Sequence, residues 1–100
     1  MIAIIDYGVG NLFSLASSLK SLGLETKVTR DAAAIRAADH IILPGVGAFA
    51  DAMAKLEATG LVPVIKQEVE HKPLLGICLG MQLLFETSYE YGEHTGLGLI

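Results

Sequence analysis

The fold is decided by residues 74–85, whose sequence is Leu-Leu-Gly-Ile-Cys-Leu-Gly-Met-Gln-Leu-Leu-Phe. The stretch 73–77 is short and largely apolar, which is typical of a strand buried on both faces of a sheet. After Cys78, the apolar residues Met81, Leu84 and Phe85 recur at helical spacing and share one helix face. The stretch therefore predicts a strand, a sharp turn at a cysteine, and a helix.

The rest of the chain repeats this alternation of short apolar runs and helical patterns. Further strands are predicted over residues 2–5, 25–29, 40–43 and 97–100, the second being more polar and nearer an edge. Helices are predicted over 12–22, 31–38, 49–56 and 61–69. This order indicates an α/β fold, doubly wound, with a mostly parallel sheet and helices on both faces. Because a domain rarely ends in the first residues of a strand, we expect the chain to be a piece of a longer protein.

Composition limits the kind of protein. The 100 residues are 52% hydrophobic and carry a formal net charge of −4, which suits one small domain with no patch for nucleic acid. The mean hydropathy is +0.53, but the longest apolar stretch is well short of the roughly 20 residues that cross a membrane. Cys78 is the one cysteine, and the N-terminus does not resemble a signal peptide. We therefore expect a cytoplasmic protein without a disulfide, a metal or a cofactor.

The strongest chemical motif is Gly76-Ile77-Cys78-Leu79-Gly80. It has the strand–nucleophile–helix form of a nucleophile elbow, in which small residues on either side let the chain turn sharply. A thiol at a helix N-terminus is favoured as the attacking thiolate, and the N–H of Leu79 would face a developing oxyanion. A buried, inert cysteine is the alternative, and these five residues leave both possibilities open.

Two glycine-containing turns follow other predicted strands. Pro44-Gly45-Val46-Gly47 is suited to supply a second oxyanion donor from Gly45, Val46 or Gly47, although a plain tight turn would look the same. Gly8-Val9-Gly10 resembles part of a dinucleotide fingerprint, but Phe13 stands at the third glycine position. A turn that brings Asp6 and Asn11 to the carboxyl edge of the sheet is the other interpretation.

Chemistry at a cysteine normally needs a base, usually histidine. His40 and His71 lie at or before the starts of predicted strands, and His94 follows the helix that leads away from Cys78. We expect none of the three to reach the thiol. These residues predict a nucleophile whose base comes from elsewhere.

Three motifs together are specific: Asp-Tyr-Gly-Val-Gly-Asn (6–11), Leu-Pro-Gly-Val-Gly-Ala-Phe (43–49) and Gly-Ile-Cys-Leu-Gly-Met-Gln-Leu-Leu-Phe (76–85). In this order they resemble the class I (triad) glutamine amidotransferases, whose fold is flavodoxin-like. Within that class, the similarity is to the glutaminase subunits of imidazole glycerol phosphate synthase. The resemblance covers all 100 residues and implies that 1–100 is the N-terminal part of one amidotransferase domain.

The resemblance implies that the complete protein hydrolyses glutamine to glutamate and ammonia. Cys78 would be the nucleophile, and the oxyanion donors would come from Leu79 and from the Gly45, Val46 and Gly47 loop. The substrate would be held by Gly47, Gln82 and Glu90. Ammonia would pass to a (β/α)8-barrel cyclase subunit, with Gly10 and Asn11 near the interface of the heterodimer.

The main departure from the family is the absence of its catalytic His and Glu, which come from the C-terminal half. We therefore expect the 100 residues alone to be inactive. The alternatives are a silent half-domain that binds the cyclase or self-associates, another hydrolase or stress protein with an elbow cysteine, and a flavin or dinucleotide module.

Overall fold

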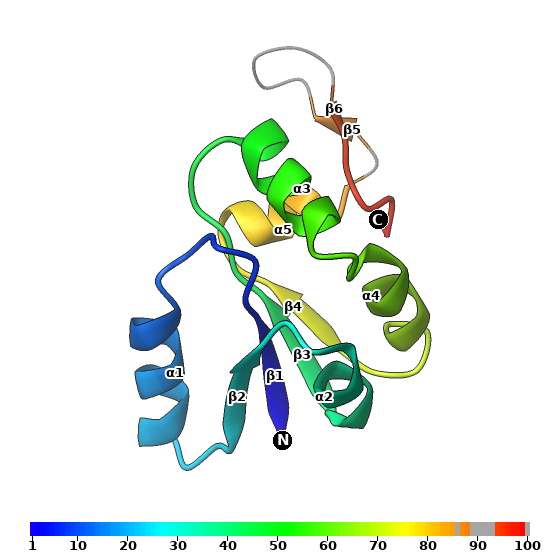
Figure 1. Cartoon of the computed structure of the whole chain (residues 1–100). Coiled ribbons are helices and arrows are strands. Elements are labelled where there is room, and N and C mark those ends of the chain that lie inside the picture. The colour runs from blue at the N-terminus through cyan, green and yellow to red at the C-terminus, as the bar shows by residue number, and fades with distance from the viewer. Residues whose placement is uncertain (86, 89–93, 100) are drawn as a thin grey trace.

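The computed structural model describes residues 1–85, 87–88 and 94–99. In this part of the chain, a parallel sheet of four strands lies at the centre, in the order β2-β1-β3-β4 (Figure 1). The strands are β1 (Ile2–Ile5), β2 (Thr26–Thr29), β3 (His40–Leu43) and β4 (Leu74–Gly76). The helices are α1 (Leu12–Ser21), α2 (Ala32–Ala37), α3 (Phe49–Ala58), α4 (Val62–Glu68) and α5 (Leu79–Leu83). Among the described residues, no helix is long and apolar enough to cross a lipid bilayer.

The parallel register brings the carboxyl ends of the strands to one edge of the sheet. Ile2 of β1 pairs with Thr26 on one side and His40 on the other, and Ile42 of β3 pairs with Leu75. The segments that leave β1, β3 and β4 therefore meet at the same edge, where ligands bind in folds of this kind. The predicted α/β architecture is confirmed, as is the edge position of β2.

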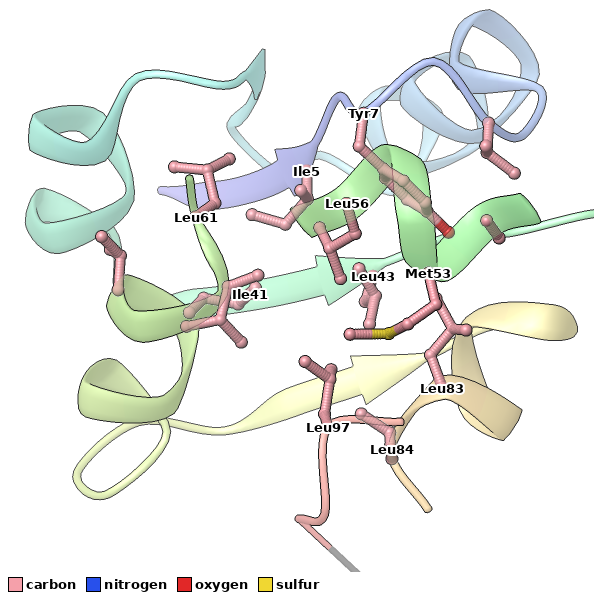
Figure 2. Close-up of a cluster of buried hydrophobic side chains, with 14 of the residues drawn as sticks. Ile5, Tyr7, Ile41, Leu43, Met53, Leu56, Leu61, Leu83, Leu84 and Leu97 are labelled. Atoms are coloured by element: carbon pink, nitrogen blue, oxygen red, sulfur yellow. The ribbon is translucent and has the colours of Figure 1, made fainter. Parts of the chain in front are cut away.

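Helices lie on both faces of the sheet, but they cover them unequally. One face packs against α2, α3 and α4 through a cluster that includes Ile5, Ile41 and Leu43 of the sheet and Met53 and Leu56 of α3 (Figure 2). Ile41 and Leu43 are at most 1% exposed, and full burial of such a side chain stabilises the fold by about 1.5–3 kcal/mol.

The opposite face is covered by α1, and it is more open. None of the residues of α1 is buried, and the apolar stripe of this helix, formed by Leu12, Leu15, Ala16 and Leu19, is only partly covered. A groove of about 450 Å³ lies on this face, with Leu19 of α1, Ile42 and Leu75 among its lining residues. Leu75 is 57% exposed.

Charged residues join α2, α4 and the segment before β4. The Lys72 ammonium lies 2.8 Å from a carboxylate oxygen of Glu68 and donates hydrogen bonds of 3.1 Å to the carbonyl oxygens of Ile35 and Arg36. Arg36 also contacts Glu68, at 3.3 Å. The hydrogen bond from Lys72 holds the pKa of the Glu68 carboxyl below its ordinary value. This network closes the C-terminal end of α2 with a paired, largely buried cation.

The predicted strand over residues 97–100 is wrong for the residues that the structure describes. Residues 97–99 do not form a strand, because the backbone N–H groups of Leu97 and Leu99 donate to the carbonyl oxygens of Leu83 and Leu84 at the C-terminal end of α5. Leu97 is nonetheless buried in the core cluster, which explains its apolar character. The segment is preceded by an antiparallel pair that the sequence analysis did not predict, β5 (Thr87–Ser88) and β6 (His94–Thr95).

The three apolar residues predicted to share one face of the helix after Cys78 are buried unequally, and of these only Leu84 lies in the core, at 8% exposure. α5 ends at Leu83, and Met81 and Phe85 are 50% and 43% exposed. The helix instead buries Leu79 and Leu83, because the sharp turn at Cys78 directs those positions toward the sheet and α3.

Candidate active site

Cys78 lies on a strained turn between β4 and α5. Its φ is 54° and its ψ is −122°, and it is the only non-glycine residue with positive φ in the described part of the chain. Such a conformation costs on the order of 1–3 kcal/mol and is typical of elbows that project a nucleophile above a sheet. Cys78 is exposed. The structure confirms the predicted strand–cysteine–helix turn and contradicts the alternative of a buried thiol.

The glycines on either side of Cys78 are required by close approaches of the backbone. A Cβ added to Gly80 would lie 1.9 Å from the carbonyl oxygen of Leu43, and one added to Gly76 would lie 2.6 Å from the Cα of Met81. Both distances are far below van der Waals contact, and both neighbours are backbone atoms. The sharp turn thus depends on these two glycines, as the sequence motif predicts.

The glycine turn after β3 packs directly against the elbow. A Cβ on Gly45 would meet the backbone nitrogen of Gly80 at 2.7 Å, so the two segments touch through their main chains. The N–H of Leu79 donates a 3.1 Å hydrogen bond to the carbonyl oxygen of Gly45. The predicted oxyanion donor Leu79 is therefore already engaged in this structure. The oxyanion hole itself stays a prediction.

A small cavity brings the three predicted loops together at the thiol. It measures about 170 Å³, and its lining includes Cys78 and Ile77 from the elbow, Gly45 and Val46 from the glycine turn, and Asn11 from the first loop. Ligand pockets usually measure about 300–1,000 Å³. The described residues thus form a recess smaller than a typical ligand site, with the exposed Cys78 thiol on its wall.

The first loop supports this recess. A Cβ on Gly10 would lie 3.2 Å from the side chain of Pro44, so Gly10 packs against the glycine turn. The side chain of Asn11 accepts a 3.2 Å hydrogen bond from the N–H of Ser14 and caps α1. Asp6 lies 3.4 Å from Arg30 at the same edge. The segment is therefore a turn that brings Asp6 and Asn11 to the carboxyl edge; the predicted interface role of Gly10 and Asn11 stays a prediction.

Tyr7, also in this loop, contributes a contact that the sequence analysis did not assign. Its side chain is 3% exposed and lies in the core cluster (Figure 2), and its hydroxyl donates a hydrogen bond to the carbonyl oxygen of Pro44. Burial raises the pKa of Tyr7 to about 12. The available signal was a tyrosine directly after a buried strand, where an aromatic ring can be buried only if its hydroxyl finds a partner.

The remaining predicted site residues are less constrained. Gly47 has a φ of 95° and is exposed at the end of the glycine turn, and Gln82 is exposed on α5. Glu90 lies outside the described residues. His40 starts β3, and His71 lies before β4, where its ring is 3.6 Å from Glu68. Both histidines are thus at the amino ends of strands, away from Cys78, as predicted.

Fold and site together define an α/β protein with an exposed cysteine on a strand–helix elbow that faces a glycine turn. The family described as glutamine amidotransferase class-I matches residues 3–95. The chain belongs to this family.

Individual relatives agree with the family assignment. An imidazole glycerol phosphate synthase subunit HisH from Moorella thermoacetica is 58% identical over 100 residues, which are 99% of this chain and 48% of that protein. Proteins with the same description from Aquifex aeolicus and Exiguobacterium sibiricum are 54% and 53% identical, with 97% and 100% of this chain covered. The chain spans about half the length of these curated relatives.

A solved structure supports the fold independently. A crystal structure described as a glutamine amidotransferase superposes with a TM-score of 0.82, covering 100% of this chain and 53% of that one. The sequence identity is 24%, so this likeness concerns the fold.

Proposed function

We propose that the complete protein is the glutaminase subunit of imidazole glycerol phosphate synthase. The observation that carries the proposal is the exposed Cys78 on its strained elbow, beside Gly45 and Val46 of the glycine turn. The description shared by relatives at 53–58% identity supports the choice of this synthase over other amidotransferases.

The proposed reaction begins at the Cys78 thiol. The Cys78 thiolate attacks the side-chain amide carbon of glutamine, and the carbonyl oxygen takes the negative charge of a tetrahedral intermediate. The C–N bond then breaks, the leaving nitrogen takes a proton, and ammonia departs from a glutamyl thioester. Water cleaves the thioester to glutamate and returns the thiol.

Stabilising the intermediate requires a rearrangement of the glycine turn. In the described structure the N–H of Leu79 is occupied by the Gly45 carbonyl. For Leu79 to donate to the oxyanion, this carbonyl has to turn away. Turning the Gly45–Val46 peptide would also direct the N–H of Val46 toward the thiol side, which yields two donors from one rotation. The observed arrangement is therefore a resting state of the site.

Substrate, partner and base complete the proposal. Gly47, Gln82 and Glu90 hold glutamine, and Gly10 and Asn11 lie near a (β/α)8-barrel cyclase that receives the ammonia in a heterodimer. The base and its carboxylate partner, the triad His and Glu, belong to the remaining half of the protein, so residues 1–100 alone have no appreciable glutaminase activity. The protein works in the cytoplasm, where its thiol stays reduced, without nucleic acid or membrane as a partner.

The decisive experiment separates glutamine chemistry from synthesis. In the complete protein with its cyclase, Cys78→Ala is expected to abolish glutamine-dependent synthesis while synthesis from added ammonia continues at the wild-type rate. Loss of both activities would mean that Cys78 is structural, and retention of both would mean that another group is the nucleophile.

For the 100-residue chain alone, a second candidate is a silent half-domain that binds the cyclase or self-associates. The observation that favours it is the open groove on the α1 face, where Leu75 is 57% exposed. Sedimentation of the isolated chain tests it: a defined monomer or dimer supports this candidate, and heterogeneous aggregation contradicts it.

A further inference from the structure

Tyr7 connects the hydrophobic core to the backbone of the glycine turn. Its ring is buried, and its hydroxyl donates to the carbonyl oxygen of Pro44. Because burial raises the pKa of Tyr7 to about 12, the hydroxyl keeps its proton at any working pH and remains a donor. The hydroxyl is therefore able to donate to the Pro44 carbonyl throughout the working pH range.

The contact lies one peptide away from the group that has to move. The Pro44 carbonyl belongs to the Pro44–Gly45 peptide, whereas the carbonyl that occupies Leu79 belongs to Gly45. The Tyr7 hydroxyl also lies against Gly45 itself, since an added Cβ there would be 2.8 Å from it. Pro44 and Gly45 are both buried, so the Tyr7 hydroxyl provides the Pro44 carbonyl with a partner where little solvent reaches it.

We propose that Tyr7 is a positioning residue for the thiol reaction: its hydroxyl fixes the Pro44–Gly45 peptide against the Cys78 elbow and confines rotation to the Gly45–Val46 peptide. This inference rests on the proposed glutaminase function. With the first peptide fixed, the turn of the second places its N–H at one defined position beside Leu79. Without the hydroxyl, both peptides can move, and the two donors no longer hold their relative geometry.

Removing the Tyr7 hydroxyl is expected to lower kcat and to leave KM unchanged, because an oxyanion hole binds a charge that exists only in the transition state. Tyr7→Phe keeps the buried ring and removes only the hydroxyl. In the complete protein with its cyclase, we expect kcat for glutamine to fall about tenfold, the effect of one buried hydrogen bond. The KM for glutamine and the rate of ammonia-dependent synthesis are expected to match wild type.

The assay first measures the fraction of molecules with a reactive Cys78, so that a fall in rate caused by unfolded protein is not mistaken for a fall in kcat. Titration with an electrophilic chloroketone analogue of glutamine gives the fraction of reactive Cys78, and kcat is expressed per reactive thiol. Thr59→Val is the matched control, since the Thr59 hydroxyl also donates to a backbone carbonyl, that of Leu56, at the distant end of α3. Thr59→Val is expected to lower the unfolding temperature without changing kcat per reactive thiol.

The outcomes separate the inference from the function on which it rests. A wild-type kcat per reactive thiol in Tyr7→Phe, whatever its unfolding temperature, would show a purely structural role for Tyr7. A loss that lies in KM would also overturn the inference. If the wild-type complex itself does not turn over glutamine, the proposed function fails, irrespective of Tyr7.

Discussion

Replacing Gly80 by alanine is expected to open the contact between the Cys78 elbow and β3. The added Cβ would lie 1.9 Å from the Leu43 carbonyl oxygen, 2.8 Å from its carbon and 3.0 Å from the carbonyl carbon of Pro44. All three are backbone atoms, so no side chain can rotate away. Ordinary van der Waals contact begins at 3.4 Å, so the shortest of these distances would have to grow by about 1.5 Å.

A shift of that size has an identifiable cost. It stretches the 3.0 Å hydrogen bond from the N–H of Ile77 to the Leu43 oxygen and the 3.1 Å bond between Leu79 and Gly45. Strained insertion of a methyl group, together with these bonds, is expected to destabilise the fold by about 3 kcal/mol. For a protein of about twice this chain's length, like its relatives, this lowers the unfolding temperature by roughly 6–12 °C.

Gly60→Ala is the matched control, because it also adds a methyl group to a glycine but does so where the added Cβ meets no other atom. Gly60 has a φ of 74° and nothing within 4 Å of an added Cβ, so its replacement is expected to cost about 1 kcal/mol. Urea unfolding of the complete protein gives both stabilities, and the alkylation rate of Cys78 reports the elbow. If the free energy of unfolding of Gly80→Ala lies within about 1 kcal/mol of the wild-type value and Cys78 is alkylated at the wild-type rate, the close contact between Gly80 and Leu43 is refuted.

Two further predictions concern charge and capping. Because Lys72 lowers the folded-state pKa of Glu68, the ionised carboxylate stabilises the fold above its unfolded pKa, and this stabilisation is lost as the pH falls below about 5. In Glu68→Gln, the free energy of unfolding should therefore decrease less between neutral and acid pH than in wild type. An equal decrease in both proteins would contradict the ion pair between Lys72 and Glu68. Asn11→Ala should destabilise α1 by about 1 kcal/mol, since the Asn11 side chain caps it. The same variant should weaken cyclase binding in a calorimetric titration, whereas unchanged affinity would exclude Asn11 from the interface.

The elements that the sequence predicted best are those with one dominant physical signal. β1 is a continuous apolar run and β3 is one after His40, and both end at the predicted residues because a charged residue or proline follows. The elbow was predictable because only small residues fit two positions on either side of the cysteine. In each case the residues within one short segment favour the same conformation that the packed fold requires.

The parts that were missed depend on contacts between distant segments. The side chain of Leu97 is buried in the core, whereas its backbone N–H donates to Leu83 at the end of α5. The apolar pattern around Leu97 does not indicate which backbone partner it has. The same holds at the site: the bond between Leu79 and Gly45 joins residues 34 positions apart, by the difference of their numbers. Tyr7 and Pro44 likewise meet only once β1 and β3 are paired.

The most direct test of the central claim is to trap the covalent intermediate. The complete protein with its cyclase is mixed with glutamine, quenched in acid within one turnover, digested and analysed by mass spectrometry. The account predicts a glutamyl group on the peptide that contains Cys78, and none when glutamine is omitted or when Cys78→Ala is used. Glutamine turnover with the glutamyl group on another residue would contradict it.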